Sequence, residues 1–572
     1  MSRPQRAVRL GPRDVVVERR ADGIVRLRSP HPLGPYSKKL TERLAHWARV
    51  SPDTVFLAQR EGEGWRRLRY KEALDRARRV GQYLLEKKLS AERPLVVLSG
   101  NDIEHALLHL GAMLVGIPYA PISPAYSLLS TDFAKLRAIF ELLTPGLVFV
   151  SDKQQFNRAL HALSLKIEVI DRLEEPDPTL AVDEAHARVG PDTIAKFLFT
   201  SGSTGTPKAV INTQRMWCSN QAMILSALPF FEDEPPVLLD WAPWHHTAAG
   251  NHDFGLALYN GGSYYIDKGR PLPGEIESTV RNLREIAPTW YFNVPKGFEM
   301  LVPFLREDPR LRAHFFSQLK VLWFAGAALP QHVFDEMKEL AYRTCGEEIA
   351  FLTGFGATET APATLARVWA AENAANMGLP PPGAELKLVP MEGRYEMRVK
   401  GPHVTPGYWR ARKLTERAFD AEGYYCIGDT FSFDRGEPAN GLLFAGRIAE
   451  DFKLLTGTWV HVGELRARFI QHFAPLVRDV VFAGDGKSDI GALIFLSGPA
   501  SREELTRRLK TLENSGSSNR ITRALVLEEP PSLDAGEMTD KGSINQRAVL
   551  SRRKHLVEEL YQNPPSGNVL WI

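Results

Sequence analysis

Short apolar runs of β type alternate with helical patterns along most of this chain, and this alternation limits the fold more than any other feature. One helical pattern is Gln331–Thr344, which places apolar residues on one face at helical spacing and has Pro330 at its start. Alternation of this kind predicts an α/β architecture with largely parallel sheets. Buried strands are expected at Leu95–Leu98, Leu147–Val150, Lys166–Ile170, Ala195–Phe199, Val321–Ala325 and Ile349–Leu352.

An uncharged stretch from Ala106 to Thr131 is long enough to cross a membrane, which takes about 20 apolar residues. However, it contains Pro118, Pro121 and Pro124, and prolines at this spacing end a helix. We therefore expect a buried helix over residues 103–114, then a short strand and a loop, in a protein that does not enter the membrane.

The composition is that of an ordinary globular protein, with 44% hydrophobic residues in 572 and a formal charge of 71 − 68 = +3. The apolar content argues against disorder, and the near balance of charge argues against nucleic-acid binding as the main activity. The three cysteines (Cys218, Cys345 and Cys426) lie far apart and suggest no disulfide or metal spacing. A reducing compartment, the cytoplasm, is therefore expected.

The first fifty residues carry an excess of eight positive charges. A targeting peptide or an anion-attracting arm would explain this excess, and so would a solvated edge of the fold. Asp14, Glu18 and Asp22 interrupt the basic run, whereas transit peptides avoid acidic residues. The sequence favours the solvated edge.

A change of pattern near residue 447 predicts two domains. Before it, Glu385–Lys400 and Gly441–Ala445 resemble strands of a β-rich subdomain. The chain after it is long enough for an independent α+β domain, so we expect domains at residues 1–446 and 447–572. Within the second domain the expected elements are strands at Val477–Ala483, Gly491–Phe495 and Ala524–Glu528 and a helix at Arg502–Glu513.

A loop rich in hydroxyls and glycine runs from Thr200 to Lys208, between a buried strand and an apparent return strand at Ala209–Asn212. Glycines let backbone N–H groups converge on an anion, and Lys208 adds positive charge. It is not a Walker loop, because Pro207 precedes the lysine and no Ser or Thr follows it. A flexible hairpin tip is the alternative, but such a tip does not need the lysine. Phosphate binding is favoured.

The loop Thr200-Ser-Gly-Ser-Thr-Gly-Thr-Pro-Lys208 resembles the signature loop of the adenylate-forming superfamily of acyl-CoA synthetases, adenylation domains and luciferases. The resemblance extends over about residues 40–550 and implies a large domain of stacked α/β sheets followed by a small mobile domain. Four further matching segments follow in the expected order: Gly354–Glu359, Tyr425–Asp429, Gly446–Lys453 and Met538–Ile544.

The resemblance implies that a carboxylate is joined to the α-phosphate of ATP, with release of pyrophosphate, and that a thiol then displaces AMP. It implies ATP, Mg²⁺ and coenzyme A as cofactors. Thr358 would contact the α-phosphate and Glu359 would bind Mg²⁺, a cation that prefers carboxylate oxygens. The implied contacts to the outer phosphates are Thr200, Ser201, Gly202, Ser203, Thr204, Gly205 and Lys208.

Other matched positions receive implied roles in the same way. Phe355, beside Gly356, would stack on adenine, with Gly326 and Ala327 as the opposite wall, and a core-filling role for Phe355 is the alternative. The remaining assignments are Asp429 and Arg447 to the ribose, His246 to the acyl pocket, Glu450 to the interdomain hinge, Lys453 to the cofactors, and Gly457 with Trp459 to the pantetheine tunnel.

The expected catalytic lysine is Lys541, although Lys541-Gly542-Ser543 departs from the superfamily's usual Ser/Asn-Gly-Lys order. A surface turn with no part in adenylation is the alternative for this residue. Near the acyl pocket, His245, His246 and His252 have no supporting carboxylate or thiolate at metal-binding spacing, so no metal is expected at these histidines.

Several segments are more similar to the feruloyl-CoA synthetase subgroup, including Lys208–Met216 and Thr539–Arg547, and that subgroup shares the Lys-Gly-Ser order. The implied substrate is a hydroxycinnamic acid, and a homodimer is compatible with the resemblance. Aromatic residues at Trp241, Trp244, Trp290, Tyr291 and Phe292 would wall the pocket or fill the core. Candidate partners for a phenolic hydroxyl are Asn251, Asn293 and Thr353.

Three functions remain open at this point. The first is an ATP-dependent aryl-CoA ligase. The second is a stand-alone enzyme that adenylates an acid and loads a separate carrier protein. The third is a non-catalytic ATP-binding protein, which the displaced lysine motivates.

Overall fold

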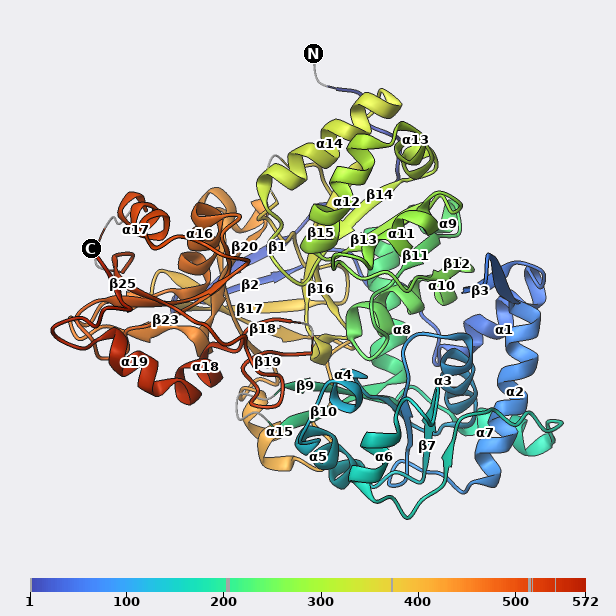
Figure 1. The fold of residues 1–572 in the computed structure, drawn as a ribbon. Coiled ribbons are helices and arrows are strands. Elements are labelled where there is room, and N and C mark those ends of the chain that lie inside the picture. The colour runs from blue at the N-terminus through green and yellow to red at the C-terminus, as the bar shows by residue number, and fades with distance from the viewer. Residues whose placement is uncertain (1–2, 202–205, 372–373, 513–515, 517, 541) are drawn as a thin grey trace.

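A computed structural model describes residues 3–201, 206–371, 374–512, 516, 518–540 and 542–572. A large body contains the N-terminal and central parts of the chain, and the C-terminal part, orange to red, forms a smaller lobe beside it (Figure 1). The α/β fold with a small C-terminal unit is confirmed.

The first sheet carries the phosphate loop. Its order is β10-β9-β6-β5-β7-β8, parallel except for β10, which returns antiparallel to β9. Parallel strands need covered faces, which explains their continuous apolar sequences. The strands are β5 (Leu95–Leu98), β6 (Tyr119–Pro121), β7 (Leu147–Val150), β8 (Val169–Ile170), β9 (Ile194–Ser201) and β10 (Pro207–Thr213).

Two four-stranded sheets form the rest of the α/β body, and each has one antiparallel edge strand. The first contains β3 (Val55–Glu61), β4 (Gly64–Arg69), β11 (Val237–Asp240) and β12 (Ser263–Ile266). The second contains β13 (Trp290–Asn293), β14 (Val321–Phe324), β15 (Ala350–Gly356) and β16 (Ala363–Ala366).

The helices of the body include the two predicted from sequence, α3 (Ile103–Val115) and α14 (Gln331–Cys345). Aromatic and aliphatic side chains from helices and sheets together form the main core. The others are α1 (Thr41–Val50), α2 (Tyr70–Glu86), α4 (Ala125–Leu128), α5 (Ala134–Leu143), α6 (Asn157–Leu163), α7 (Leu180–Arg188), α8 (Gln214–Ala227), α9 (Phe230–Asp233), α10 (Phe254–Asn260), α11 (Ile276–Leu283), α12 (Pro295–Glu307), α13 (Pro309–Ser317) and α15 (Arg412–Ala418).

An antiparallel six-stranded sheet confirms the β-rich subdomain and includes the basic N-terminal segment. Blue β1 and β2 lie beside yellow β17 and β18 in Figure 1. The N-terminal segment is therefore part of a sheet edge, as the solvated-edge interpretation expected. The strands are β1 (Val16–Arg19), β2 (Val25–Arg28), β17 (Glu385–Met391), β18 (Arg394–Lys400), β19 (Tyr425–Phe433) and β20 (Leu442–Arg447).

The C-terminal lobe has its own apolar core, which begins at Phe452, whereas the core of the β-rich subdomain ends at Leu442. The boundary at residues 446 and 447 stays a prediction that lies between these two clusters. The elements are β21 (Phe452–Lys453), β22 (Trp459–Val460), α16 (Val462–Phe473), β23 (Val477–Ala483), β24 (Ile490–Leu496), α17 (Arg502–Thr511), β25 (Ile521–Val526), α18 (Gln546–Arg552), α19 (Lys554–Leu560) and β26 (Leu570–Trp571).

Three predicted strands were wrong in their bounds, and one of them, Ile349–Leu352, is the longer strand Ala350–Gly356. The run Lys166–Ile170 forms strand only at Val169–Ile170, because β8 is an edge strand that pairs with β7 over two positions. The last predicted strand, Ala524–Glu528, begins earlier, since β25 pairs with β24 from Ile521. Among the described residues, no helix is long and apolar enough to cross a membrane.

Candidate functional site

The two arms of the phosphate loop are the antiparallel strands β9 and β10, in which Thr200 lies opposite Lys208. The Thr200 hydroxyl is buried and has no hydrogen-bond partner in the described structure. The Lys208 ammonium lies 4.7 Å from the ring centre of Tyr408. A donor without a partner and a cation therefore stand at the start and end of the loop. Gly202, Ser203, Thr204 and Gly205 lie outside the described residues, as does the Ser201 side chain.

Glu359 is held beside these arms by the segment that follows β15. Its backbone carbonyl accepts from the Thr405 N–H (2.8 Å), and the Thr405 hydroxyl donates to the Ile211 carbonyl of β10 (2.7 Å). Glu359 is only 7% exposed, and Thr358 beside it is also buried. The local backbone thus joins the Thr358–Glu359 pair to the phosphate-loop sheet.

The Glu359 carboxylate receives the Tyr408 hydroxyl at 2.9 Å, and Tyr408 also lies 3.2 Å from the Tyr425 hydroxyl. Burial and the nearby Glu359 charge raise the pKa of Tyr425 well above its ordinary value. Within the described part of the chain, no lysine or arginine forms an ion pair with Glu359. A buried carboxylate with one neutral donor fits Mg²⁺, which binds carboxylate oxygens and phosphate together.

Asp429 lies opposite Arg447 in the β19–β20 pair, with 3.6 Å between Oδ1 and the guanidinium Nε. Burial raises the pKa of the Asp429 carboxyl to about 6, opposed by Arg447 and assisted by the charges of Glu450 and Glu359. Two matched ribose positions and the predicted Mg²⁺ ligand therefore share one electrostatic environment.

Phe355 contacts two further rings on β19 and β20. Its centre lies 5.0 Å from Phe431 edge-on and 6.1 Å from Phe444 in a stacked arrangement. Phe444 is 41% exposed, an aromatic surface beside Phe355 that the sequence reasoning missed. A run of aromatic and aliphatic residues in β20 was its only signal. The aromatic group lies on the same strand pair as Asp429 and Arg447.

The glycines near Phe355 meet different constraints. A Cβ on Gly356 would lie 1.7 Å from the Pro362 carbonyl oxygen, so a side chain is excluded there. Gly326 has φ +89°, a conformation that favours glycine, and with Ala327 it is exposed at the end of β14. The predicted walls of the adenine site thus come from the ends of neighbouring strands, β14 and β15.

His245 and His246 lie in the loop after β11, and the C-terminal lobe supplies a carboxylate to them. Oδ2 of Asp540 is 3.3 Å from His245 Nε2 and 3.4 Å from His246 Nε2. Sequence spacing could not reveal Asp540, because the fold brings it from another domain. His252 instead contacts Asp253 (2.8 Å) in the π-helical turn Ala248–Asp253.

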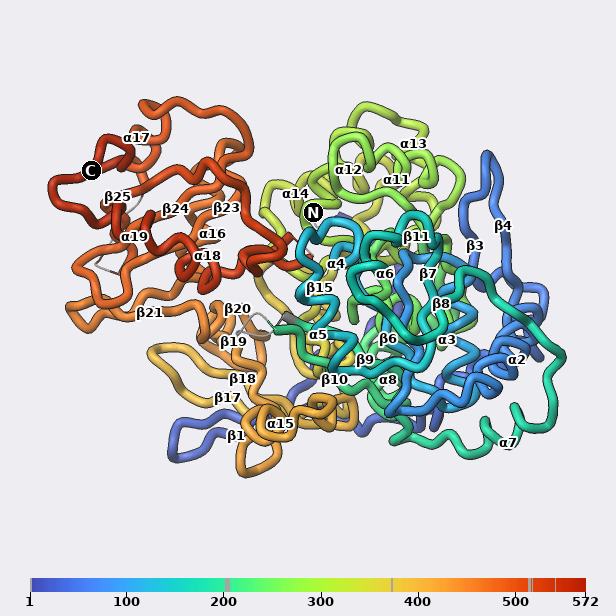
Figure 2. Tube along the Cα trace, turned by 60° about the horizontal axis from the view of Figure 1, so that its bottom comes forward, coloured from blue at the N-terminus to red at the C-terminus, as the bar shows by residue number. Residues whose placement is uncertain are grey.

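Lys541 lies outside the described residues, but its flanking turn is described. The Thr539 N–H donates to the Ser543 carbonyl (2.8 Å), and the Gly542 N–H donates to the Thr539 carbonyl (2.9 Å). Figure 2 shows red C-terminal chain reaching from the lobe toward the large body. Asp534 accepts from the Thr131 backbone N–H (2.9 Å) and hydroxyl (2.7 Å), which fixes the loop before Lys541 on the body.

A fully buried carboxylate, Glu537, organises this lysine loop and was also missed by the sequence reasoning. Glu537 accepts from Arg553 at 2.7 and 2.9 Å, from Arg552 at 2.8 Å and from the Ser532 N–H at 2.9 Å. Burial opposes ionisation, but the Arg553 hydrogen bonds hold the pKa of Glu537 below its ordinary value. Ion pairs between Glu537 and the two arginines therefore stabilise the loop from within the C-terminal lobe.

The predicted hinge residue, Glu450, ends a short 3₁₀ turn, and its carbonyl accepts from Gln546 at 2.9 Å. The next residue, Asp451, is ion-paired with Arg394 of β18 and accepts from the Val462 N–H at 3.1 Å. Asp451 thus contacts both domains. In the sequence, its position in the matched hinge segment is the only sign that Asp451 contacts both domains.

The predicted pantetheine loop is the hairpin between β21 and β22. Gly457 adopts φ +86° there, and the Lys453 ammonium lies 5.8 Å from the ring centre of Trp459. This hairpin belongs to the C-terminal lobe and is separate from the phosphate-loop sheet.

Of the aromatic residues expected around an acyl pocket, Trp244, Trp290 and Tyr291 are fully buried core side chains, so they fill the core. Phe292 is also buried, whereas Trp241 is partly exposed and donates to Asn293 at 3.1 Å. Of these five aromatic residues, Trp241 is the one whose side chain is exposed enough to contact a ligand.

The structure ranks the three candidate partners for a phenolic hydroxyl. The Thr353 hydroxyl already donates to Phe324, and the Asn293 amide oxygen accepts from Trp241 and from the Val294 N–H. Asn251 is completely buried, and its amide nitrogen donates to Asn212 at 2.9 Å, while its Oδ1 has no hydrogen-bond partner among the described residues. Only Asn251 of the three offers an unsatisfied acceptor.

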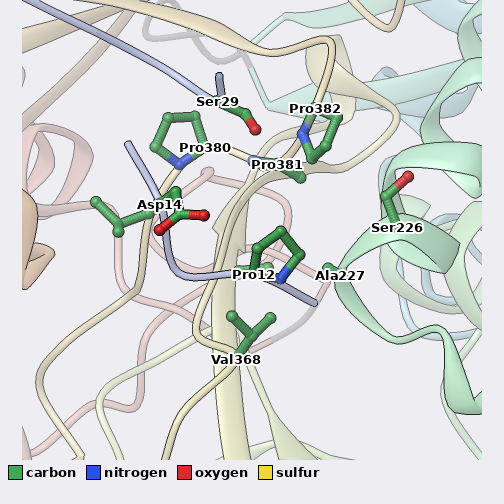
Figure 3. A pocket seen from close by; sticks show the side chains of 11 residues that line it. Pro12, Asp14, Ser29, Ser226, Ala227, Val368, Pro380, Pro381 and Pro382 are labelled. Carbon is green, nitrogen blue, oxygen red and sulfur yellow. The ribbon is translucent and has the colours of Figure 1, made fainter. Parts of the chain in front are cut away.

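A cavity of about 20 Å³ lies away from these residues, beside the N-terminal segment and Pro380–Pro382 (Figure 3). Its volume suits a water molecule. It is too small for a nucleotide or an aromatic acid.

Comparison with known proteins identifies the fold and the family. Residues 44–409 match the AMP-binding enzyme family, and residues 452–564 match the AMP-binding enzyme C-terminal domain. Anthranilate–CoA ligase of Pseudomonas aeruginosa is 29% identical over 297 residues, which cover 50% of this chain and 52% of the relative. Feruloyl-CoA synthase of an Amycolatopsis species is 29% identical over 255 residues, covering 43% and 48%. The chain spans about half the length of these curated relatives.

Among solved structures, O-succinylbenzoate coenzyme A synthetase from Bacillus subtilis in complex with AMP superimposes with a TM-score of 0.69. It is 18% identical, covering 90% of this chain and 98% of that one. ATP-bound MatB from Rhodopseudomonas palustris gives the same TM-score and identity, covering 91% and 99%. These similarities extend the fold assignment over both lobes.

Proposed function

This chain belongs to the AMP-binding enzyme family, and we propose that it is an ATP-dependent ligase that joins an aromatic carboxylic acid to coenzyme A through an acyl-adenylate. The observation that carries the proposal is that Tyr408 and the charge of Glu359 link three elements of the candidate site. They are the β9–β10 arms with Thr200 and Lys208, the buried Glu359 carboxylate, and the Asp429–Arg447 pair.

Adenylation brings a carboxylate to a triphosphate, so neutralising charge is the main requirement. In the proposal, Lys208 and the phosphate loop hold the outer phosphates. The Thr200 hydroxyl, which has no hydrogen-bond partner among the described residues, supplies a donor. Thr358 contacts the α-phosphate. Glu359 holds Mg²⁺, which supplies positive charge to the phosphates when it is bound. Asp429 and Arg447 orient the ribose, and Phe355 with Gly356, Gly326 and Ala327 receives the adenine.

The small domain supplies the remaining groups in this proposal. Lys541 acts on the reacting carboxylate and α-phosphate in the first step. Support comes from Asp534 and Asp540, which precede it in the chain and contact Thr131 and His245 of the large body. The domain then turns about Glu450, and Lys453, Gly457 and Trp459 face the incoming thiol. Such alternation is the kind of hinge motion that short terminal segments of elements permit.

The acid is proposed to be a hydroxycinnamate such as ferulate, with His246 beside its carboxylate. Support comes from Asn251, whose buried Oδ1 can accept a phenolic hydroxyl. Leaving a buried polar group unpaired costs about 1–3 kcal/mol, so a bound phenol would satisfy both partners. Replacing Asn251 by Leu should reduce the preference for p-coumarate over cinnamate by about 5- to 100-fold in kcat/KM. An equal loss of kcat/KM for both acids would show that Asn251 does not recognise the phenolic hydroxyl.

The decisive test incubates the protein with ATP, Mg²⁺ and a panel of acids, with and without coenzyme A. The proposal expects acid-dependent pyrophosphate in both cases and a thioester only with coenzyme A. Pyrophosphate without thioester would favour an enzyme that loads a separate carrier. Nucleotide binding without either product would favour a non-catalytic protein. A cytoplasmic location and a homodimer stay predictions.

A further inference from the structure

The contact between His245, His246 and Asp540 brings three metal-ligating side chains of two domains together. All three candidate ligand atoms lie within 4.8 Å of one another. Their side chains are between 10% and 12% exposed, so the cluster is largely enclosed but accessible to a small ion. Two imidazoles and a carboxylate are a donor set that Zn²⁺ binds.

The distances within the cluster fit a shared metal better than direct hydrogen bonds. Ion-assisted N–H···O⁻ bonds are about 2.7–2.9 Å long, whereas Asp540 Oδ2 stands 3.3 and 3.4 Å from the two imidazole nitrogens. Tetrahedral Zn²⁺ has ligand bonds of about 2.1 Å, which separate its ligand atoms by about 3.4 Å. One carboxylate oxygen therefore lies at the ligand–ligand distance from both nitrogens.

We propose that His245, His246 and Asp540 form a binding site for a divalent transition-metal ion such as Zn²⁺, complete only while the lysine loop is docked on the large domain. The two histidines belong to the loop after β11, and Asp540 belongs to the C-terminal lobe. Water completes the fourth position. Mg²⁺ does not compete effectively, because it prefers oxygen ligands over imidazole.

Metal in this site would join the two domains. The consequence for catalysis rests on the proposed function. In that function the docked arrangement of the two domains serves adenylation, and the small domain must turn away before the thioester forms. The bound ion would then slow the second step more than the first. The metal would act as an inhibitor that holds the enzyme after adenylation.

The experiment uses the full chain and the metal alone. Titration with Co²⁺ should give the intense visible absorption of a tetrahedral site, with one ion bound per chain and displaced by Zn²⁺. His245→Gln and Asp540→Asn should each weaken binding by at least about 10- to 100-fold, the loss that even an outer-shell change produces. His31→Gln is the matched control. His31 lies 3.2 Å from Asp14 in an exposed His–Asp pair, and no described residue adds a third ligand there, so binding should be unchanged.

Equal binding by wild type and Asp540→Asn would overturn the interdomain site, and so would an absorption spectrum of octahedral Co²⁺. Asp540→Glu, which keeps a carboxylate, should restore part of the affinity, and an unchanged Tm shows that each variant folds. Activity supplies an independent arm. If metal binds as expected but no pyrophosphate or thioester forms, the proposed function fails and the metal site stands. If Zn²⁺ inhibits both steps equally, the domain-locking consequence is wrong.

Discussion

Two buried carboxylates, Glu359 in the large domain and Glu537 in the small one, have opposite surroundings. Glu537 is fully buried and receives two arginines and a backbone N–H. Glu359 is buried to a similar degree but receives one neutral tyrosine hydroxyl, with no ion pair among the described residues. A buried charge needs a partner, because its desolvation is otherwise uncompensated.

The difference distinguishes a carboxylate with a structural role from the one that the proposed function assigns to ligand binding. The Glu537 charge is balanced by the protein itself, so it stabilises the lysine loop without any ligand. The Glu359 charge has no lysine or arginine ion-pair partner in the described part of the chain. It lies near Asp429, whose pKa is raised to about 6 by burial and by the charges of Glu450 and Glu359. In the proposed function, this surplus of negative charge is where Mg²⁺ and the phosphates of ATP would bind.

The largest effect on stability should come from Glu537→Gln. Removing one partner of a buried ionic cluster leaves the arginines uncompensated and costs about 3–5 kcal/mol. Because the small domain has its own core, we expect a lower denaturation midpoint for that domain, measured by tryptophan fluorescence and hydrogen exchange. Glu558→Gln, in an exposed pair with Lys554, should leave the midpoint unchanged. Equal stability of Glu537→Gln and wild type would contradict the structural role.

Glu359→Gln should have the reverse profile. We expect acid-dependent pyrophosphate release to fall by about 10²–10³-fold, as when one electrostatic contact to a transition state is lost. Thermal stability should be equal or higher, because a buried charge has been removed. Rapid-quench measurement of pyrophosphate and a thermal melt test the two parts. A large loss of stability with full activity would contradict this prediction, because it would show that Glu359 has a structural role like that of Glu537.

Asp429→Asn should stabilise the ligand-free protein. A carboxyl whose pKa is about 6 in the folded state and about 4 in the unfolded state costs up to about 3 kcal/mol when it is ionised. This cost grows as pH rises from about 4 to 6 and is complete above 6. The variant should therefore raise Tm at pH 7.5 but not at pH 4, while weakening AMP binding in calorimetry. The same increase in Tm at both pH values would contradict the raised pKa.

Tyr408→Phe should have the smallest effect. It removes the 2.9 Å hydrogen bond to Glu359, and a bond to a charged group contributes about 1.5–3 kcal/mol. Part of that loss should be recovered when Mg²⁺ binds the carboxylate, so pyrophosphate release should fall about 10-fold and the Mg²⁺ requirement should rise. Tyr395→Phe, on β18, serves as a control. Unchanged Mg²⁺ dependence in Tyr408→Phe would show that the tyrosine does not affect Mg²⁺ binding by Glu359.

Much of the fold followed from the sequence, because periodicity and apolar runs are local. The helices predicted at 103–114 and 331–344 each extend one residue further, and the strands at 95–98 and 147–150 match their predictions. The bounds of β8 and β25 were wrong since strand ends depend on pairing with neighbours. Local patterns carry no information about the partner strand.

The site divides in the same way. Thr200, Lys208, Glu359 and Asp429 could be found because each lies in a compact motif. Asp540, Glu537 and Phe444 could not, since their importance comes from contacts with residues far away in the chain. The absence of a carboxylate near His245 in sequence did not predict its absence in space.

The most direct test of the acyl-adenylate mechanism follows an oxygen atom. Ferulate labelled with oxygen-18 in its carboxylate is incubated with the protein, ATP, Mg²⁺ and coenzyme A, and the AMP is analysed by mass spectrometry. If a carboxylate oxygen attacks the α-phosphorus beside Glu359, each AMP released by the thiol carries one oxygen-18 atom. Unlabelled AMP, or label in inorganic phosphate together with ADP, would contradict the account.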